Sequence, residues 1–214
     1  MSLHLSSNNF SGEVPPEFGE FKELVNLGLP FNNLVGELPQ SLGSWAKFNS
    51  IEVSANSLSG PIPSDMCKQG AMQSLSMMQN NFSGEIPTTY ASCETLLSFI
   101  VSKNSLSGEV PDGLWALPKV ITIDLADNQF TGGIGSGIGN AASLTDLVLA
   151  RNLPWAWHIF VPLLTISGFF FSLLMCMGYL GKHDAEQFLW QDSRDVRELQ
   201  DTLVVLGLQE LALW

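Results

Sequence analysis

The stretch SFIVSKNSLSGEVP, residues 98–111, contains the pattern that decides the fold, because the same frame returns along the chain at a constant interval. Its asparagine belongs to an evenly spaced series of seven: Asn8, Asn32, Asn56, Asn80, Asn104, Asn128 and Asn152. A fixed period of about 20–50 residues is typical of a solenoid, in which each coil contacts only its neighbours.

Apolar residues stand five and three positions before each asparagine, as Phe99 and Val101 do before Asn104. This alternation predicts a short strand with one buried face. One coil cannot bury its own apolar edge, so stacked coils should share a continuous core. The asparagine amide should enter that core and bond to the backbone of adjacent coils, because buried polar groups need partners.

A glycine and then, in five repeats, a proline follow the asparagine, which predicts a sharp turn and a stiff exit. The return segment should be loop-like or a single helical turn. It carries a third apolar series: Phe18, Leu42, Met66, Tyr90, Leu114 and Ile138. In the sixth repeat Gly135 replaces the proline. The glycine-rich stretch around it, 132–139, fits neither phosphate-loop spacing and is interpreted as a slack turn.

The consensus LxLxxNxLSGxIP resembles the plant-specific leucine-rich repeats of receptor-like kinases and receptor-like proteins. The resemblance covers six full repeats and a partial seventh, residues 1–152. Residues 65–68, 90–93 and 113–118 are more specifically similar to a HAIKU-type receptor-like kinase ectodomain. The expected fold is therefore α/β, a leucine-rich-repeat solenoid with a curved parallel sheet on its concave face.

The resemblance implies a ligand- or protein-binding module from an ectodomain that perceives secreted peptides, with a peptide ligand or a co-receptor protein as partner. The kinase domain of such receptors is missing from this sequence, so no enzyme activity is expected. Related receptors often hold a ligand carboxylate with two arginines on a late repeat. On this face the basic residues are Lys103 and Arg151, which departs from that pattern.

Candidate ligand-binding residues are those that flank the second strand leucine and should face the concave side. The face mixes small polar residues with apolar ones, as a peptide groove would. The residues are Phe31, Glu52, Ser54, Met78, Gln79, Ile100, Ser102, Lys103, Asp124, Asp127 and Arg151.

Two further kinds of site are expected if the chain is exported. Asn9 and Asn81 each begin an Asn-Phe-Ser glycosylation acceptor, and we place both in the turn beside the core asparagine. Cys67 and Cys93 lie at similar positions of adjacent repeats, where a convex-side disulfide would form under oxidising conditions. In a reducing compartment both would simply be buried thiols.

The period stops at residue 153, and no charged residue occurs from 153 to 181. Within this stretch 159–180 is an apolar run long enough to cross a bilayer as a helix, which predicts a single-pass plasma-membrane protein. The remaining 182–214 form a short acidic and amphipathic tail. Residues 1–5 do not read as a signal peptide. An appended sequence from a truncated or unspliced transcript is the alternative source of 153–214.

Charge and composition exclude several classes of function. The net charge of −12 and the absence of a basic stripe argue against nucleic acid as a partner. Neither a metal site nor a cofactor site is expected, because the three histidines are scattered and the cysteines lack ligand spacing. The alternatives to a receptor module are a kinase-less fragment or decoy, and a soluble intracellular repeat scaffold.

Overall fold

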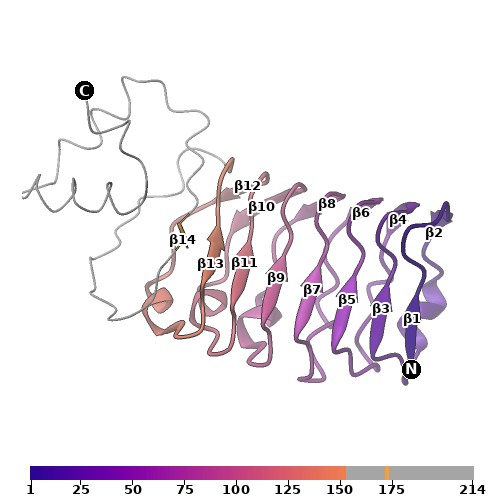
Figure 1. Cartoon of the computed structure of the whole chain (residues 1–214), viewed down its shortest axis with the longest axis horizontal. Coiled ribbons are helices and arrows are strands. Elements are labelled where there is room, and N and C mark those ends of the chain that lie inside the picture. The colour runs from indigo at the N-terminus through magenta and orange to yellow at the C-terminus, as the bar shows by residue number, and fades with distance from the viewer. Residues whose placement is uncertain (153–171, 174–214) are drawn as a thin grey trace, which may run out of the picture. The chain divides into compact units, whose positions relative to one another are not determined.

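The computed structural model describes residues 1–152 and 172–173. This part lies within one compact unit, Met1–Cys176. Its coils follow one another in chain order, with the strands of successive coils side by side (Figure 1). The predicted leucine-rich-repeat solenoid is therefore confirmed.

One strand from each coil forms a parallel sheet, here called the first sheet. Its pairing partners occupy the same position of successive repeats, as Leu3 is opposite Leu27 and Ile51 opposite Leu75. Equivalent positions of successive coils therefore lie in straight rows. The strands, in spatial order, are β1 (Ser2–His4), β3 (Asn26–Gly28), β5 (Ser50–Glu52), β7 (Ser74–Ser76), β9 (Ser98–Ile100), β11 (Thr122–Asp124), β13 (Asp146–Val148) and β14 (Ser172–Leu173).

The segments after the first six asparagines of the series form a second parallel sheet, where we had predicted only turns. The reason is visible in residues 33–35, in which an exposed Asn33, a buried Leu34 and an exposed Val35 alternate as in any half-buried strand. The register is offset from the repeat here, as Ser107 is opposite Gln129 rather than Thr131. The strands are β2 (Ser11–Glu13), β4 (Asn33–Glu37), β6 (Ser57–Gly60), β8 (Asn81–Gly84), β10 (Ser105–Glu109) and β12 (Gln129–Thr131).

The return segments are short, and among the described residues their helices are all of the 3₁₀ type. This agrees with the expectation of a loop or a single helical turn in each return segment, since so short a repeat leaves room for little more than one turn. A proline before three of them fixes the backbone for entry. The helices are η1 (Pro16–Glu20), η2 (Thr88–Ser92), η3 (Asp112–Ala116) and η4 (Ser136–Asn140).

The expected membrane helix over 153–181 and the tail over 182–214 lie outside the described residues, with one exception. Ser172 and Leu173 form strand β14, which pairs in parallel with the edge strand β13. At these two positions the helical prediction is wrong, because their backbone continues the first sheet. In the described part of the chain, no helix has the length and apolar character to cross a membrane.

The asparagine series ties successive coils together, as expected. Asn80 is buried, and its Nδ2 donates to the carbonyl oxygens of Val53 in the preceding coil and Met77 in its own, at 3.0 and 3.2 Å. Its Oδ1 accepts the backbone N–H of Leu58 at 3.0 Å. Asn32, Asn56, Asn104, Asn128 and Asn152 make equivalent bonds. One amide per coil thus satisfies backbone groups from two coils.

Trp115 explains the irregular glycine of the sixth coil. Its indole ring is fully buried on η3, at a position that is Gly19, Gly43 or Ala91 in other coils. A Cβ placed on Gly135 would lie 2.5 Å from Trp115 Cδ1. The proline of the other repeats has no space here, because the large indole of the preceding coil occupies it.

Candidate functional site

Most of the predicted ligand-binding residues lie in two rows that run across the first sheet. The central row contains Glu52, Ile100 and Asp124, the last residues of β5, β9 and β11. The second row lies two residues farther along each coil and contains Ser54, Met78 and Ser102. Met78 and Ile100 are half-buried, so each keeps part of its apolar surface open to a ligand.

The other predicted residues form a ridge beside these rows. Phe31, Gln79, Lys103, Asp127 and Arg151 each directly precede a core asparagine, and each has a positive φ of 55–58°. Left-handed backbone at non-glycine residues is uncommon and costs about 1–2 kcal/mol at each position. This left-handed backbone was not predicted from the sequence, because no glycine marks it; the fixed position before the buried asparagine was the available signal. Phe31 is the most open apolar member, with 61% of its surface exposed.

Hydrogen bonds fix two carboxylates of the central row in the same way. Glu52 Oε1 accepts the backbone N–H of Ser54 at 3.0 Å, and Asp124 Oδ1 accepts that of Ala126 at 3.1 Å. Both acids therefore bond to the N–H two residues farther along. The buried Ser102 also donates its hydroxyl to Asp124 Oδ2 at 2.7 Å.

The cationic end of the ridge is neutralised within the solenoid. Arg151 forms a two-pronged ion pair with Asp127, through Nε and through Nη2, the latter 2.6 Å from Oδ2. The Arg151 bond holds the pKa of Asp127 below its ordinary value, and the nearby charges of Arg151 and Lys103 act in the same direction. Arg151 is thus engaged by an acid of its own chain. Phe31, by contrast, lies near the opposite end of the face, several coils away.

One glycosylation acceptor lies on the second sheet, and the other lies just before it. Asn81 is the exposed first residue of β8. Asn9 is exposed shortly before β2, and its Oδ1 accepts the side-chain amide of Asn33 at 2.5 Å. Asn81 is therefore the more accessible glycosylation acceptor, because the Asn9 side chain is engaged by Asn33.

A disulfide joins Cys67 to Cys93 on the return side of the third and fourth coils, with the Cα atoms 5.9 Å apart. Both cysteines are buried, with 7% and 2% of their surfaces exposed. A bond of this kind persists in oxidising compartments such as the secretory pathway and the cell exterior.

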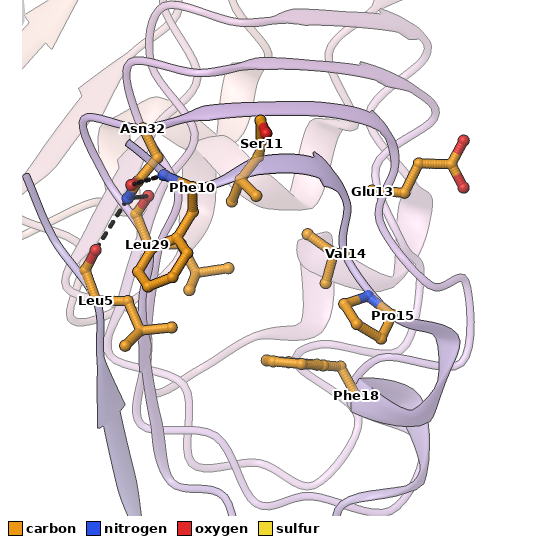
Figure 2. A pocket seen from close by; sticks show the side chains of 10 residues that line it. Leu5, Phe10, Ser11, Glu13, Val14, Pro15, Phe18, Leu29 and Asn32 are labelled. Atoms are coloured by element: carbon orange, nitrogen blue, oxygen red, sulfur yellow. Dashed lines mark hydrogen bonds between the residues drawn. The ribbon is translucent and has the colours of Figure 1, made fainter. Parts of the chain in front are cut away.

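A hollow of about 270 Å³ lies at the N-terminal end of the solenoid, away from the candidate face. Figure 2 shows Leu5, Phe10, Val14 and Phe18 around it, with the bonds of Asn32 to Phe10 and Leu5 on one side. Its apolar lining continues the shared core, so we interpret it as the exposed edge of that core rather than as a recognition site.

Among the described residues, no group of three or more His, Cys, Asp or Glu side chains lies close enough to hold a metal ion. His4 lies against the backbone of Gly28, where an added Cβ would be 2.7 Å from its Nδ1. The described coils contain repeats alone, with no part of a kinase domain.

The comparisons with known proteins agree with this architecture. A leucine-rich-repeat family model matches residues 1–21. Comparison with curated proteins found no match. The Arabidopsis receptor kinase HAESA, solved with the peptide hormone IDA and the co-receptor SERK1, is 37% identical over 71% of this chain and 25% of that chain, with a TM-score of 0.70. A TDR receptor is 39% identical over 71% of this chain and 26% of that one, with a TM-score of 0.68.

The same fold also occurs in a protein described as a plant ice-binding protein, at 26% identity over 70% of this chain and 48% of that one, with a TM-score of 0.61. The fold alone therefore does not fix the ligand. This chain spans about a quarter of the length of the receptor chains that it matches. The described chain is thus a leucine-rich-repeat solenoid whose structural neighbours include ectodomains of plant receptor kinases.

Proposed function

We propose that this chain is a peptide-binding module of a plant receptor, with the exposed face of the first sheet as its ligand site. The observation that carries the proposal is the varied composition of that face. Phe31 exposes 61% of its surface, and Met78 and Ile100 are partly open between polar residues. Apolar side chains on a rigid surface, surrounded by polar groups, are typical of a binding site.

The neighbours support a secreted peptide as ligand and a co-receptor as second partner. HAESA was solved with a peptide hormone and SERK1, and the peptide hormone receptor RGFR1, 28% identical, with RGF2. The ridge and rows described above would supply the contacts: Phe31, Glu52, Ser54, Met78, Gln79, Ile100, Ser102, Lys103, Asp124, Asp127 and Arg151.

Export to the cell surface belongs to the same proposal. The buried Cys67–Cys93 disulfide supports folding in an oxidising compartment. The exposed acceptors Asn9 and Asn81 would carry glycans there, on the outer side of the plasma membrane. The division into a solenoid over 1–152, an apolar segment over 153–181 and a tail over 182–214 is part of this proposal.

The narrower assignment is to the HAIKU-type receptors, on the basis of residues 65–68, 90–93 and 113–118. Within that assignment, a kinase-less product that competes for partners is the alternative to a signalling receptor. Comparison of the transcript with the genomic sequence at codons 152 and 153 distinguishes these two possibilities. If an exon ends there and the transcript continues into the intron, the kinase-less fragment is favoured.

The ligand proposal is tested with the full chain purified from the secretory pathway of plant cells. The chain is incubated with the peptide fraction secreted by those cells, and retained peptides are identified by mass spectrometry. We expect retention by the natural chain and its loss from the triple variant Phe31→Ser, Met78→Ser and Ile100→Ser. Val35→Ser is the matched control, because Val35 is 43% exposed on the second sheet.

Equal retention by the natural chain and the triple variant would exclude this face as the ligand site. A chain that remains cytosolic and unglycosylated in plant cells would instead favour the intracellular scaffold.

A further inference from the structure

The central row of the first sheet places two carboxylates on either side of an uncharged interval. Glu52 is opposite Ser76, Ser76 is opposite Ile100, and Ile100 is opposite Asp124. The two acids thus lie in one row, three strand spacings apart. Neighbouring strands are about 4.8 Å apart, so this separation is roughly 14 Å.

Both carboxylates are held before any ligand arrives. Each has one oxygen on a backbone N–H two residues ahead, and Asp124 has a second bond from Ser102. The described residues engage only one oxygen of Glu52 by hydrogen bonding. Fixed acceptors of this kind bind a cation without first losing side-chain freedom.

The charge of these two acids is not balanced by direct ion pairs. In the described part of the chain, the salt bridges are Lys68–Asp65 and Arg151–Asp127, and neither involves Glu52 or Asp124. Lys103 lies on the ridge, where its charge acts on Asp127. The net charge of −12 adds a long-range attraction for cations.

The space between the carboxylates is partly apolar. Ile100 lies in the interval and Met78 lies in the adjoining row, and both are half-buried. An extended peptide advances about 3.4 Å per residue, so roughly 14 Å corresponds to about four residues.

We propose that this row binds an extended peptide segment with two basic side chains four residues apart and an apolar side chain between them. The basic groups would contact Glu52 and Asp124, and the apolar one would pack on Met78 and Ile100. The segment would run along the row, across the strands. This inference rests on the proposed peptide-binding function and specifies the chemistry of its ligand.

The test uses three peptides with blocked ends, KSLSK, KKSSL and ESLSE, and the full chain. The first has the proposed spacing, the second has the same composition without it, and the third reverses the charge. We expect KSLSK to bind about 5-fold tighter than KKSSL, with binding of ESLSE weakest, as measured by calorimetric titration at low salt.

The variants Glu52→Gln and Asp124→Asn should each weaken KSLSK binding about 3- to 5-fold, since each removes one charge but keeps the shape. Glu37→Gln removes an exposed charge from the second sheet and should leave the affinity unchanged. Circular dichroism checks that all three variants are folded.

The inference is overturned if KSLSK and KKSSL bind equally, if none of the peptides binds, or if Glu37→Gln weakens binding as much as Glu52→Gln. Retention of other secreted peptides by the natural chain, and its loss from the triple apolar variant, would then show that the peptide-binding function stands with a different ligand chemistry. Absence of both effects would remove the function as well.

Discussion

The two sheets of the solenoid are built from the same repeat, yet their outward residues differ. On the second sheet the outward positions are mostly Ser or Asn, and a Glu recurs near the strand end in four of the six coils. On the first sheet the equivalent rows hold Glu, Ser, Ile, Asp and Met. Since both sheets stack equally regularly, stacking does not require this variety. The first sheet is therefore where the sequence is free to specify a ligand.

The second sheet is uniform partly because neighbouring coils interlock on its surface. A Cβ on Gly108 would lie 2.7 Å from Glu85 Cγ, and one on Gly60 would lie 2.5 Å from Glu37 Cγ. Each of these glutamates lies across the glycine of the next coil. In the coil before Gly84, the position of this glutamate is taken by Pro61. Accordingly, no atom lies within 4 Å of a Cβ added to Gly84.

The largest effect is expected where both sheets depend on one residue. Asn80→Ala leaves the buried N–H of Leu58 and the carbonyls of Val53 and Met77 without their side-chain partner. We expect a loss of about 3 kcal/mol in the free energy of unfolding, as measured with urea. Asn81→Ala, one residue later on the exposed strand end, should change it by less than about 0.5 kcal/mol. Similar losses from both variants would contradict the role of the amide series.

The interlocking of the second sheet predicts unequal costs for two glycines with the same backbone. Gly108 and Gly84 have φ of 77° and 82°. Gly84→Ala should cost about 1 kcal/mol from the backbone alone, and Gly108→Ala about 2 kcal/mol because Glu85 must also move. Adding Glu85→Ala to Gly108→Ala should bring the cost back toward that of Gly84→Ala. Thermal unfolding of the natural chain, the two single variants and the double variant measures these costs. Equal costs for Gly84→Ala and Gly108→Ala would mean that Glu85 does not restrict residue 108.

A serine of the first sheet should matter more than one of the second. Ser102 is 3% exposed and its hydroxyl bonds to Asp124, whereas Ser83 is exposed on β8. We expect Ser102→Ala to cost about 1 kcal/mol of stability and Ser83→Ala close to none. If the urea midpoints of both variants show the same small change, the hydrogen bond from Ser102 to Asp124 does not stabilise the candidate face.

Some of these features could be predicted from the sequence and others could not. The constant period of the asparagines and the apolar pair before each of them were enough to predict the solenoid, the first sheet and the buried amides, because each follows from local chemistry repeated in register. The second sheet was missed, because residues such as Asn33 and Ser57 look like turn formers until coils stack. The positive φ of Phe31 and the space that Trp115 takes beside Gly135 depend on neighbouring coils, which a single repeat does not reveal.

The smallest effect concerns the ion pair at the end of the ridge. Because Arg151 lowers the pKa of Asp127 in the folded chain, the pair stabilises the fold above the unfolded-state pKa of an aspartate. That contribution is lost as the pH falls through the lower folded-state pKa. The Arg151 side chain is 54% exposed, so solvent limits the effect to about 0.5 kcal/mol. Arg151→Gln should therefore lower the unfolding temperature slightly at pH 7 and leave it unchanged near pH 2. An equal loss at both pH values would show that Arg151 acts through packing of its aliphatic side chain rather than through charge. The end of the ridge would then differ from the central row, where the carboxylates are proposed to act through their charge.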